Sequence, residues 1–89
     1  MVKIVLIASL SQILGFRETK IEIDNVSIKE LGVELIKRSP KFSAIFSDDG
    51  SLKPGYLLLV NDTDYRLLGE EYRIRKNDVV AILPVSHGG

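Results

Sequence analysis

The chain has 89 residues, which is enough for one domain built around a single hydrophobic core. Its 12 Lys and Arg residues balance 12 Asp and Glu residues, so the formal net charge is +0 and nucleic acid is not expected as a direct partner. The absence of cysteine excludes disulfides, a thiol nucleophile and cysteine metal ligands, and it is compatible with a reducing cytoplasm, where we expect the protein.

The first predicted element is a strand over residues 2–8, apolar except for Lys3. Because a lysine rarely points into a core, strand alternation assigns the two faces. Val5 and Ile7 share the face of Lys3. The face predicted to point to the core holds Val2, Ile4, Leu6 and Ala8. The apolar run over 4–8 is shorter than that of a signal peptide, and no stretch reaches the length of a membrane span, so we expect no membrane partner.

The strongest local signal predicts a helix that begins near residue 28. Ser27 and Glu30 have the spacing of a capping box, in which each side chain accepts a hydrogen bond from the other's backbone. An apolar stripe follows at helical spacing, and Pro40 predicts an end near Arg38. Residues 9–17 are expected to form a connection, and the alternation over 18–23 predicts a second strand.

The second half of the chain predicts three more strands. Residues 41–55 are irregular and rich in turn residues, with three apolar residues expected to pin the segment to the core: Phe42, Ile45 and Phe46. Residues 56–60 and 79–83 are continuous apolar runs, typical of buried strands. Residues 61–64 predict a turn, and residues 72–75 a short edge strand. The element order therefore predicts an α+β fold with one main helix on a mixed four- to five-stranded sheet.

One helix cannot cover both faces of such a sheet, so an uncovered apolar face is expected. If Val80 and Ile82 face the helix, Ala81 and Leu83 join Val5 and Ile7 on the other face. An exposed apolar patch predicts a docking site for a partner protein. Two alternatives remain open: the 41–55 segment covers this face, or the chain self-associates through it.

The last residues predict a tail that follows a compact body. We expect a domain over residues 1–83 and a flexible tail over 84–89, because Pro84 cannot donate to a sheet ladder. Gly88 and Gly89 end the chain, and glycine is costly to order but thin enough to enter a narrow channel of another protein. A frayed chain end is the alternative interpretation.

Nothing in the sequence predicts a catalytic or metal site. His87 is the single histidine, and no second imidazole or cysteine accompanies it. The aspartates at 48, 49, 62 and 64 lack the other ligands of a calcium loop and are better explained as turn residues. The basic cluster over 73–76 is typical of a solvated edge, with guidance of an acidic partner as the alternative.

Five further features of the sequence belong together: Pro-Gly-Tyr-Leu-Leu-Leu-Val-Asn-Asp-Thr-Asp over 54–64, Leu-Leu-Gly-Glu over 67–70, Asp78, His87 and the closing Gly-Gly. In these features the chain resembles the ubiquitin-related modifier family of β-grasp sulfur carriers, which is related to the molybdopterin synthase small subunit. The stretch Leu-Pro-Val-Ser over 83–86 departs from the modifier pattern toward the molybdopterin branch. The resemblance implies a β-grasp (ubiquitin-like) fold.

The resemblance also implies the chemistry and the partners. An activating enzyme that uses ATP and magnesium would adenylate the Gly89 carboxylate, and a sulfurtransferase or other persulfide donor would convert it to a thiocarboxylate. Gly88 and His87 would help the partner to recognise the tail. The chain would be a cosubstrate with no bound cofactor and no catalytic residue of its own. Its sulfur would serve transfer RNA thiolation through a tRNA thiolase, and conjugation to lysines of target proteins is a further use. The alternatives are a molybdopterin synthase small subunit, paired with the large subunit, and a non-covalent β-grasp interaction module.

Overall fold

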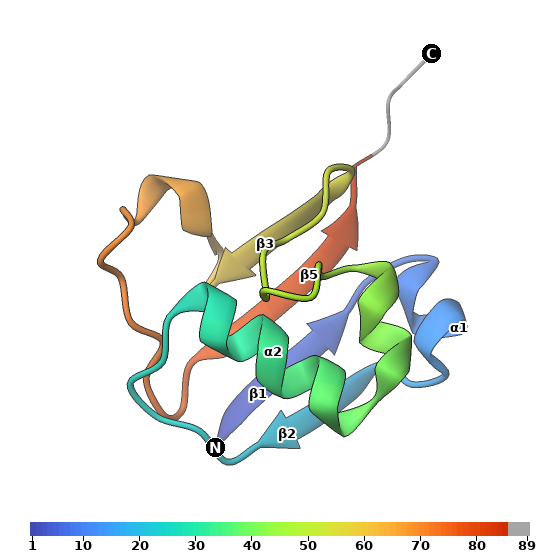
Figure 1. Ribbon diagram of the computed structural model, residues 1–89, viewed down its shortest axis with the longest axis horizontal. Coiled ribbons are helices and arrows are strands. Elements are labelled where there is room, and N and C mark those ends of the chain that lie inside the picture. Colours follow the sequence, from blue (N-terminus) through green and yellow to red (C-terminus); the bar gives the residue numbers. More distant parts are fainter. Residues whose placement is uncertain (86–89) are drawn as a thin grey trace.

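The computed structural model describes residues 1–85 and contains one mixed sheet with a helix lying across one of its faces (Figure 1). The sheet has five strands in the order β2-β1-β5-β3-β4. In chain order the elements are β1 (Val2–Leu6), α1 (Leu10–Leu14), β2 (Glu18–Ile21), α2 (Ile28–Arg38), the 3-10 helix η1 (Pro40–Ala44), β3 (Tyr56–Val60), β4 (Thr63–Asp64), the 3-10 helix η2 (Tyr65–Leu67) and β5 (Val79–Pro84).

The first and last strands lie side by side and parallel at the centre of the sheet, and the other pairings are antiparallel. This arrangement, with α2 crossing the sheet diagonally in Figure 1, is the predicted β-grasp fold. Because β5 is central, its C-terminal end at Pro84 lies in the middle of the sheet rather than at an edge.

The core lies between the sheet and α2, and the strand parity predicted from Lys3 is confirmed within β1. Val2, Ile4 and Leu6 are buried, as are Val80 and Ile82 of β5. Each such side chain, when fully buried, contributes about 1.5–3 kcal/mol. The other fully buried large side chains come from both layers: Leu10, Leu31, Leu35, Phe42, Ile45, Phe46, Leu58, Ile74 and Val60.

Helix α2 begins and ends where the sequence predicts. The Ser27 hydroxyl accepts from the Glu30 N–H at 3.1 Å, and the Glu30 carboxylate accepts from the Ser27 N–H at 3.0 Å, which completes the capping box. Hydrogen bonding to the Glu30 carboxylate, first from the Ser27 backbone and then from its side chain, lowers the pKa of Glu30. The helix stops at Arg38, because the residue before Pro40 is pushed into an extended conformation.

The segment after α2 is pinned as predicted, and it lies on the helical side of the sheet. Phe42, Ile45 and Phe46 are fully buried. The turn that follows η1 comes close to α2 at Gly50, which lies against Gly32 of the helix. A Cβ on Gly32 would collide with the Gly50 carbonyl and lie 2.8 Å from the Phe46 ring, so the helix needs glycine here.

Several sequence predictions are wrong in detail. Residues 9–17 include a short helix, α1, and Ala8 is exposed because its φ of 57° ends the strand alternation. Residues 72–75 form no strand; only Ile74 makes an isolated bridge, to Val26. The fifth strand is β4, which overlaps the predicted turn.

The last strand runs one residue further than predicted, through Pro84. The Val85 N–H donates to the Gly55 carbonyl at 2.8 Å. Because backbone groups alternate in direction along a strand, the nitrogen of the preceding residue, Pro84, points away from β3. On that side the Ile7 N–H donates to the Ile82 carbonyl, and the next acceptor of a parallel ladder, the Ile7 carbonyl, accepts instead from the Leu10 N–H at 3.3 Å. The missing N–H of proline therefore ends the pairing with β1 but leaves this carbonyl with a partner.

Candidate docking face and the C-terminal strand

The face of the sheet opposite α2 carries the four side chains predicted to dock a partner. The strand register places Val5 beside Ala81. Leu83 lies two residues further along β5 on the same face, and Ile7 follows β1 with its N–H bonded to the Ile82 carbonyl at 3.0 Å. Val5, Ala81 and Leu83 are half-buried, and Ile7 is 39% exposed. Their shared face is confirmed; partner docking there stays a prediction.

Strand β3 extends this apolar surface beyond the residues named from the sequence. Leu57 pairs with Leu83, and Leu59 pairs with Ala81. Both leucines are half-buried on the same face. The continuous apolar run over 56–60 contained the signal, but its parity could not be fixed without the pairing. We define the docking face as Val5, Ile7, Leu57, Leu59, Ala81 and Leu83.

One end of the docking face is charged and the other leads to the tail. Lys3 lies beside β2 on this side of the sheet and pairs with Glu18 at 3.8 Å, with Lys20 directly opposite in the register. At the far end, β5 passes Leu83 and stops at Pro84. The segment 41–55 packs on the helical side, so the interpretation that it covers the docking face is wrong. Gly89, Gly88 and His87 lie outside the described residues.

The turn after β3 has a structural role. Asn61 and Asp62 have φ values of 49° and 71°, the pair of positive values that a two-residue hairpin of type I′ requires. The side-chain oxygen of Asn61, Oδ1, accepts from the Val79 N–H at 2.9 Å, which ties this turn to the start of β5. Among residues 1–85 no group of three potential metal-ligating side chains occurs.

Asp78 holds the long connection before β5 in place. Its carboxylate accepts from the Arg75 N–H at 2.8 Å, the Asn61 amide at 3.0 Å and the Tyr72 hydroxyl at 3.2 Å. Burial alone would raise the pKa of Asp78, but these hydrogen bonds outweigh it and the pKa is lowered. Burial and the neighbouring Asp78 charge raise the pKa of Tyr72. The network therefore fixes where β5, and with it the docking face, begins.

Two remaining sequence hypotheses concern charged residues. Asp64 is paired with Arg66 at 2.6 Å, and hydrogen bonds from the Arg66 side chain and backbone lower the pKa of Asp64, so this aspartate stabilises η2. Arg73 contacts Glu30 at 3.3 Å and the Asn25 carbonyl at 2.7 Å, so it fastens the connection to the α2 cap.

None of the helices in the described part of the chain is long and apolar enough to cross a bilayer.

Comparison with known proteins identifies the family. The family model described as Urm1 (Ubiquitin related modifier) matches residues 3–89. Ubiquitin-related modifier 1 of Saccharomyces cerevisiae (strain YJM789) is 31% identical over 99% of this chain and 97% of its own length. Ubiquitin-related modifier 1 of Coccidioides immitis is 44% identical over 70% of this chain, and that match spans only 53% of the fungal protein.

Solved structures agree with this assignment. Sulfolobus solfataricus Urm1 has a TM-score of 0.72 and 28% identity, over 93% of this chain and 99% of that one. The small archaeal modifier protein 1 of Methanosarcina acetivorans has a TM-score of 0.77 and 27% identity, over 99% and 95% of the two chains. A molybdopterin converting factor subunit of Pyrococcus furiosus shares the fold, at 23% identity and a TM-score of 0.72 over 96% and 97%. With a family model that covers nearly the whole sequence, this chain belongs to the ubiquitin-related modifier family.

Proposed function

We propose that this chain is a ubiquitin-like sulfur carrier and protein modifier whose Gly89 carboxylate is activated by a partner enzyme. The family match, which includes the two terminal glycines, supports this proposal. A carboxylate is a poor electrophile, so a leaving group must be supplied before sulfur can be added. The carboxylate would attack the α-phosphorus of ATP, which releases pyrophosphate and leaves an acyl-adenylate. Magnesium and ATP would be bound by the activating enzyme and not by this chain.

The sulfur step follows from the same chemistry. The terminal sulfur of a persulfide on a sulfurtransferase attacks the activated carbonyl carbon, and AMP leaves. A second thiol then attacks the sulfurtransferase cysteine's sulfur in the resulting acyl disulfide; a disulfide forms between these two sulfurs, and the thiocarboxylate of Gly89 is the leaving group. In this scheme the chain is a cosubstrate in the cytoplasm, and a transfer RNA thiolase consumes the sulfur. Attack by a lysine amine on the activated carbonyl would instead conjugate the chain to a target protein.

The observation that carries the proposal is the position of β5. This strand is central in the sheet, it contributes two of the six residues of the apolar docking face, and it leads directly into the C-terminal residues. A partner seated on Ala81 and Leu83 would therefore hold the chain just before the residues that it must activate. A charged rim at Lys3 and Glu18, at the opposite end, would orient the partner.

Intact-mass spectrometry tests the proposal. The full chain is incubated with its activating enzyme, ATP, magnesium and a persulfide-loaded sulfurtransferase. We expect a mass increase equal to the exchange of one oxygen atom for sulfur, located in the C-terminal peptide. A chain that lacks Gly88 and Gly89 is the control and should gain no mass. An unchanged mass of the full chain, while a known carrier reacts in the same mixture, would contradict the proposal.

Two further outcomes separate the alternatives. A chain without the two glycines that keeps its cellular function would indicate a non-covalent interaction module. Stable co-purification with a large synthase subunit would favour the molybdopterin branch. The family model and the relatives of 30% identity or more carry the ubiquitin-related modifier name, which favours the modifier branch.

A further inference from the structure

Two lysines lie opposite each other at one corner of the docking side of the sheet. In the register between β1 and β2, Lys3 pairs with Lys20. The Leu6 N–H donates to the Arg17 carbonyl at 2.8 Å, so the hydrogen-bonded pairs of this ladder are those of the even-numbered β1 residues. The two lysines therefore form a non-hydrogen-bonded pair, the kind in which opposite side chains come closest. Both point to the docking side, because Lys3 has the same parity as Val5.

The charge of Lys20 is not balanced within the described part of the chain. Glu18, two residues away on β2, already contacts the ammonium of the opposite lysine at 3.8 Å. Glu22 follows β2, but the Ile23 N–H donates to the Ile21 carbonyl at 3.1 Å, so the chain turns there and leaves the ladder. Lys20 makes no ion pair with any of residues 1–85. Because like charges directly opposite each other destabilise a sheet, the fold retains an unfavourable pair at this corner.

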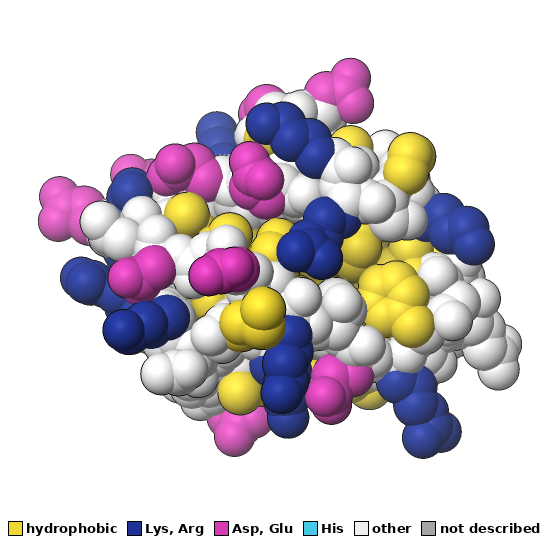
Figure 2. Space-filling view, turned by 90° about the horizontal axis from the view of Figure 1, so that it is seen from below, with side chains coloured by type: hydrophobic (Ala, Val, Ile, Leu, Met, Phe, Trp, Pro, Cys, Tyr) yellow, Lys and Arg dark blue, Asp and Glu magenta, His cyan; other side chains and the backbone are white. Residues whose placement is uncertain are grey.

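The lysine pair is continuous with the docking face and open to a partner. Lys3 lies beside Val79 in the register between β1 and β5, and Val79, on the same side as Ala81, is 37% exposed. Figure 2 views the molecule from the side on which β2 lies in Figure 1, and charged side chains lie there on either side of hydrophobic atoms. At about 3.3 Å per residue, β5 extends roughly 17 Å from Val79 to its end at Pro84.

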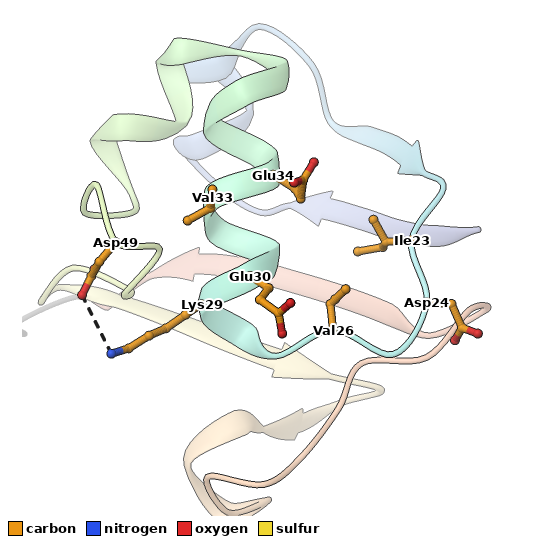
Figure 3. A pocket seen from close by; sticks show the side chains of 8 residues that line it. All are labelled: Ile23, Asp24, Val26, Lys29, Glu30, Val33, Glu34 and Asp49. Carbon is orange, nitrogen blue, oxygen red and sulfur yellow. Dashed lines mark ion pairs between the residues drawn. The ribbon is translucent and has the colours of Figure 1, made fainter.

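The helical side of the molecule carries the opposite charge. Figure 3 shows Glu30 and Glu34 projecting from α2, and Lys29 directed toward Asp49, which it contacts at 3.8 Å. Even with the contacts that Lys37 and Arg73 make there, carboxylates outnumber cations in the hollow along α2. The hollow itself is lined by four carboxylates and one ammonium: Asp24, Glu30, Glu34, Asp49 and Lys29. An acidic partner surface is therefore repelled from α2 and attracted to the docking side.

We propose that an acidic side chain of the activating enzyme binds between Lys3 and Lys20, at the rim of the apolar contact with the docking face. Its carboxylate balances the charge that the fold leaves on Lys20. The apolar side chains supply contact area, whereas the charged corner determines which end of the partner meets which end of β5. The carboxylate then lies roughly 17 Å from the point where the enzyme receives the chain beyond β5. This inference rests on the proposed function, because it names the group by which the activating enzyme recognises the chain.

Charge reversal at Lys20 should act in opposite directions on binding and on folding. Lys20→Glu replaces the repulsive pair with Lys3 by an attractive one, so Tm should not fall, and a rise of up to about 6 °C is expected. The association rate with the activating enzyme, measured by biolayer interferometry, should fall about three- to ten-fold in roughly 50 mM salt, with a smaller change in the dissociation rate. The deficit should shrink in roughly 500 mM salt, because salt screens exposed charges.

Lys41→Glu is the matched control for this substitution. Lys41 is an exposed residue of η1, on the helical side of the sheet, and it makes no ion pair within residues 1–85. The variant has the same net charge as Lys20→Glu and should associate like the unaltered chain. A charge swap completes the test. In a panel of Asp→Lys and Glu→Lys substitutions in the activating enzyme, one should restore the association rate of Lys20→Glu and lower that of the unaltered chain.

Three results would overturn the inference. The first is an unchanged association rate of Lys20→Glu; if the unaltered chain still supports pyrophosphate exchange, the proposed function stands without this contact. The second is an equal loss in Lys41→Glu, or a fall in the Tm of Lys20→Glu. The third is a dimer of the chain alone in sedimentation experiments that Lys20→Glu dissociates, which would assign the corner to a second copy. A lack of exchange with the unaltered chain would instead contradict the proposed function, and the binding comparison is made independently of it.

Discussion

Replacing Leu83 with aspartate should separate docking from folding. Leu83 is half-buried on the docking face and lies opposite Leu57 in the register. A partner that covers it would bury the remaining half, and full burial of a leucine contributes about 1.5–3 kcal/mol. An aspartate there would also lose its water shell without gaining a cation. A loss of about 2 kcal/mol or more in binding, roughly 30-fold in affinity, is the expected result.

The effect of Leu83→Asp on stability should be smaller. The variant loses one cross-strand apolar pair, about 1 kcal/mol or less, which corresponds to a fall of roughly 4–8 °C in Tm for a domain of this size. Affinity for the activating enzyme is measured by biolayer interferometry, and Tm by circular dichroism. Leu67→Asp is the matched control, because Leu67 is 80% exposed on η2 and lies outside the docking face. Unchanged affinity of Leu83→Asp, or an equal loss in Leu67→Asp, would refute the choice of face.

Three other substitutions test separate parts of the structure. Gly32→Ala should cost about 1–3 kcal/mol in urea unfolding, because its Cβ would collide with Gly50; a neutral effect would mean that this contact yields easily. Asp78→Asn should lower stability by about 1–2 kcal/mol at pH 7. Because the folded-state pKa of Asp78 lies below its unfolded value, its contribution is present above the unfolded pKa, about 3.9, and is lost as pH falls through the folded pKa. The difference in the free energy of unfolding between Asp78→Asn and the unaltered chain should therefore become smaller as the pH falls. A difference that stays constant in acid would contradict the role of the charge. Gly89→Ala should slow adenylation without changing Tm, and a large fall in Tm would indicate that the terminus packs against the body.

The sequence predicted the elements whose signals are local. The capping box at Ser27 and Glu30 fixes the start of α2 through two hydrogen bonds between neighbours, so no distant contact is needed to recognise it. The parity of β1 followed from Lys3 alone. These predictions hold because the side-chain period of a strand and the spacing of a cap are set by backbone geometry.

The errors arose where distant contacts decide the conformation. Residues 72–75 alternate like a strand, but Arg73 and Ile74 are fastened to the α2 cap and to Val26 and do not join the sheet. β4 consists of two residues whose pairing depends on the I′ turn before it. Leu57 and Leu59 joined the docking face only once the pairing of β3 with β5 was known.

The release of pyrophosphate tests the central claim most directly. The claim is that the β-grasp body presents Gly89 to an enzyme that activates its carboxylate. The purified chain, mixed with its activating enzyme, magnesium and ATP, should support exchange of labelled pyrophosphate into ATP, and a chain lacking Gly88 and Gly89 should not. No exchange with the full chain, using an enzyme preparation that is active on another carrier, would contradict the account.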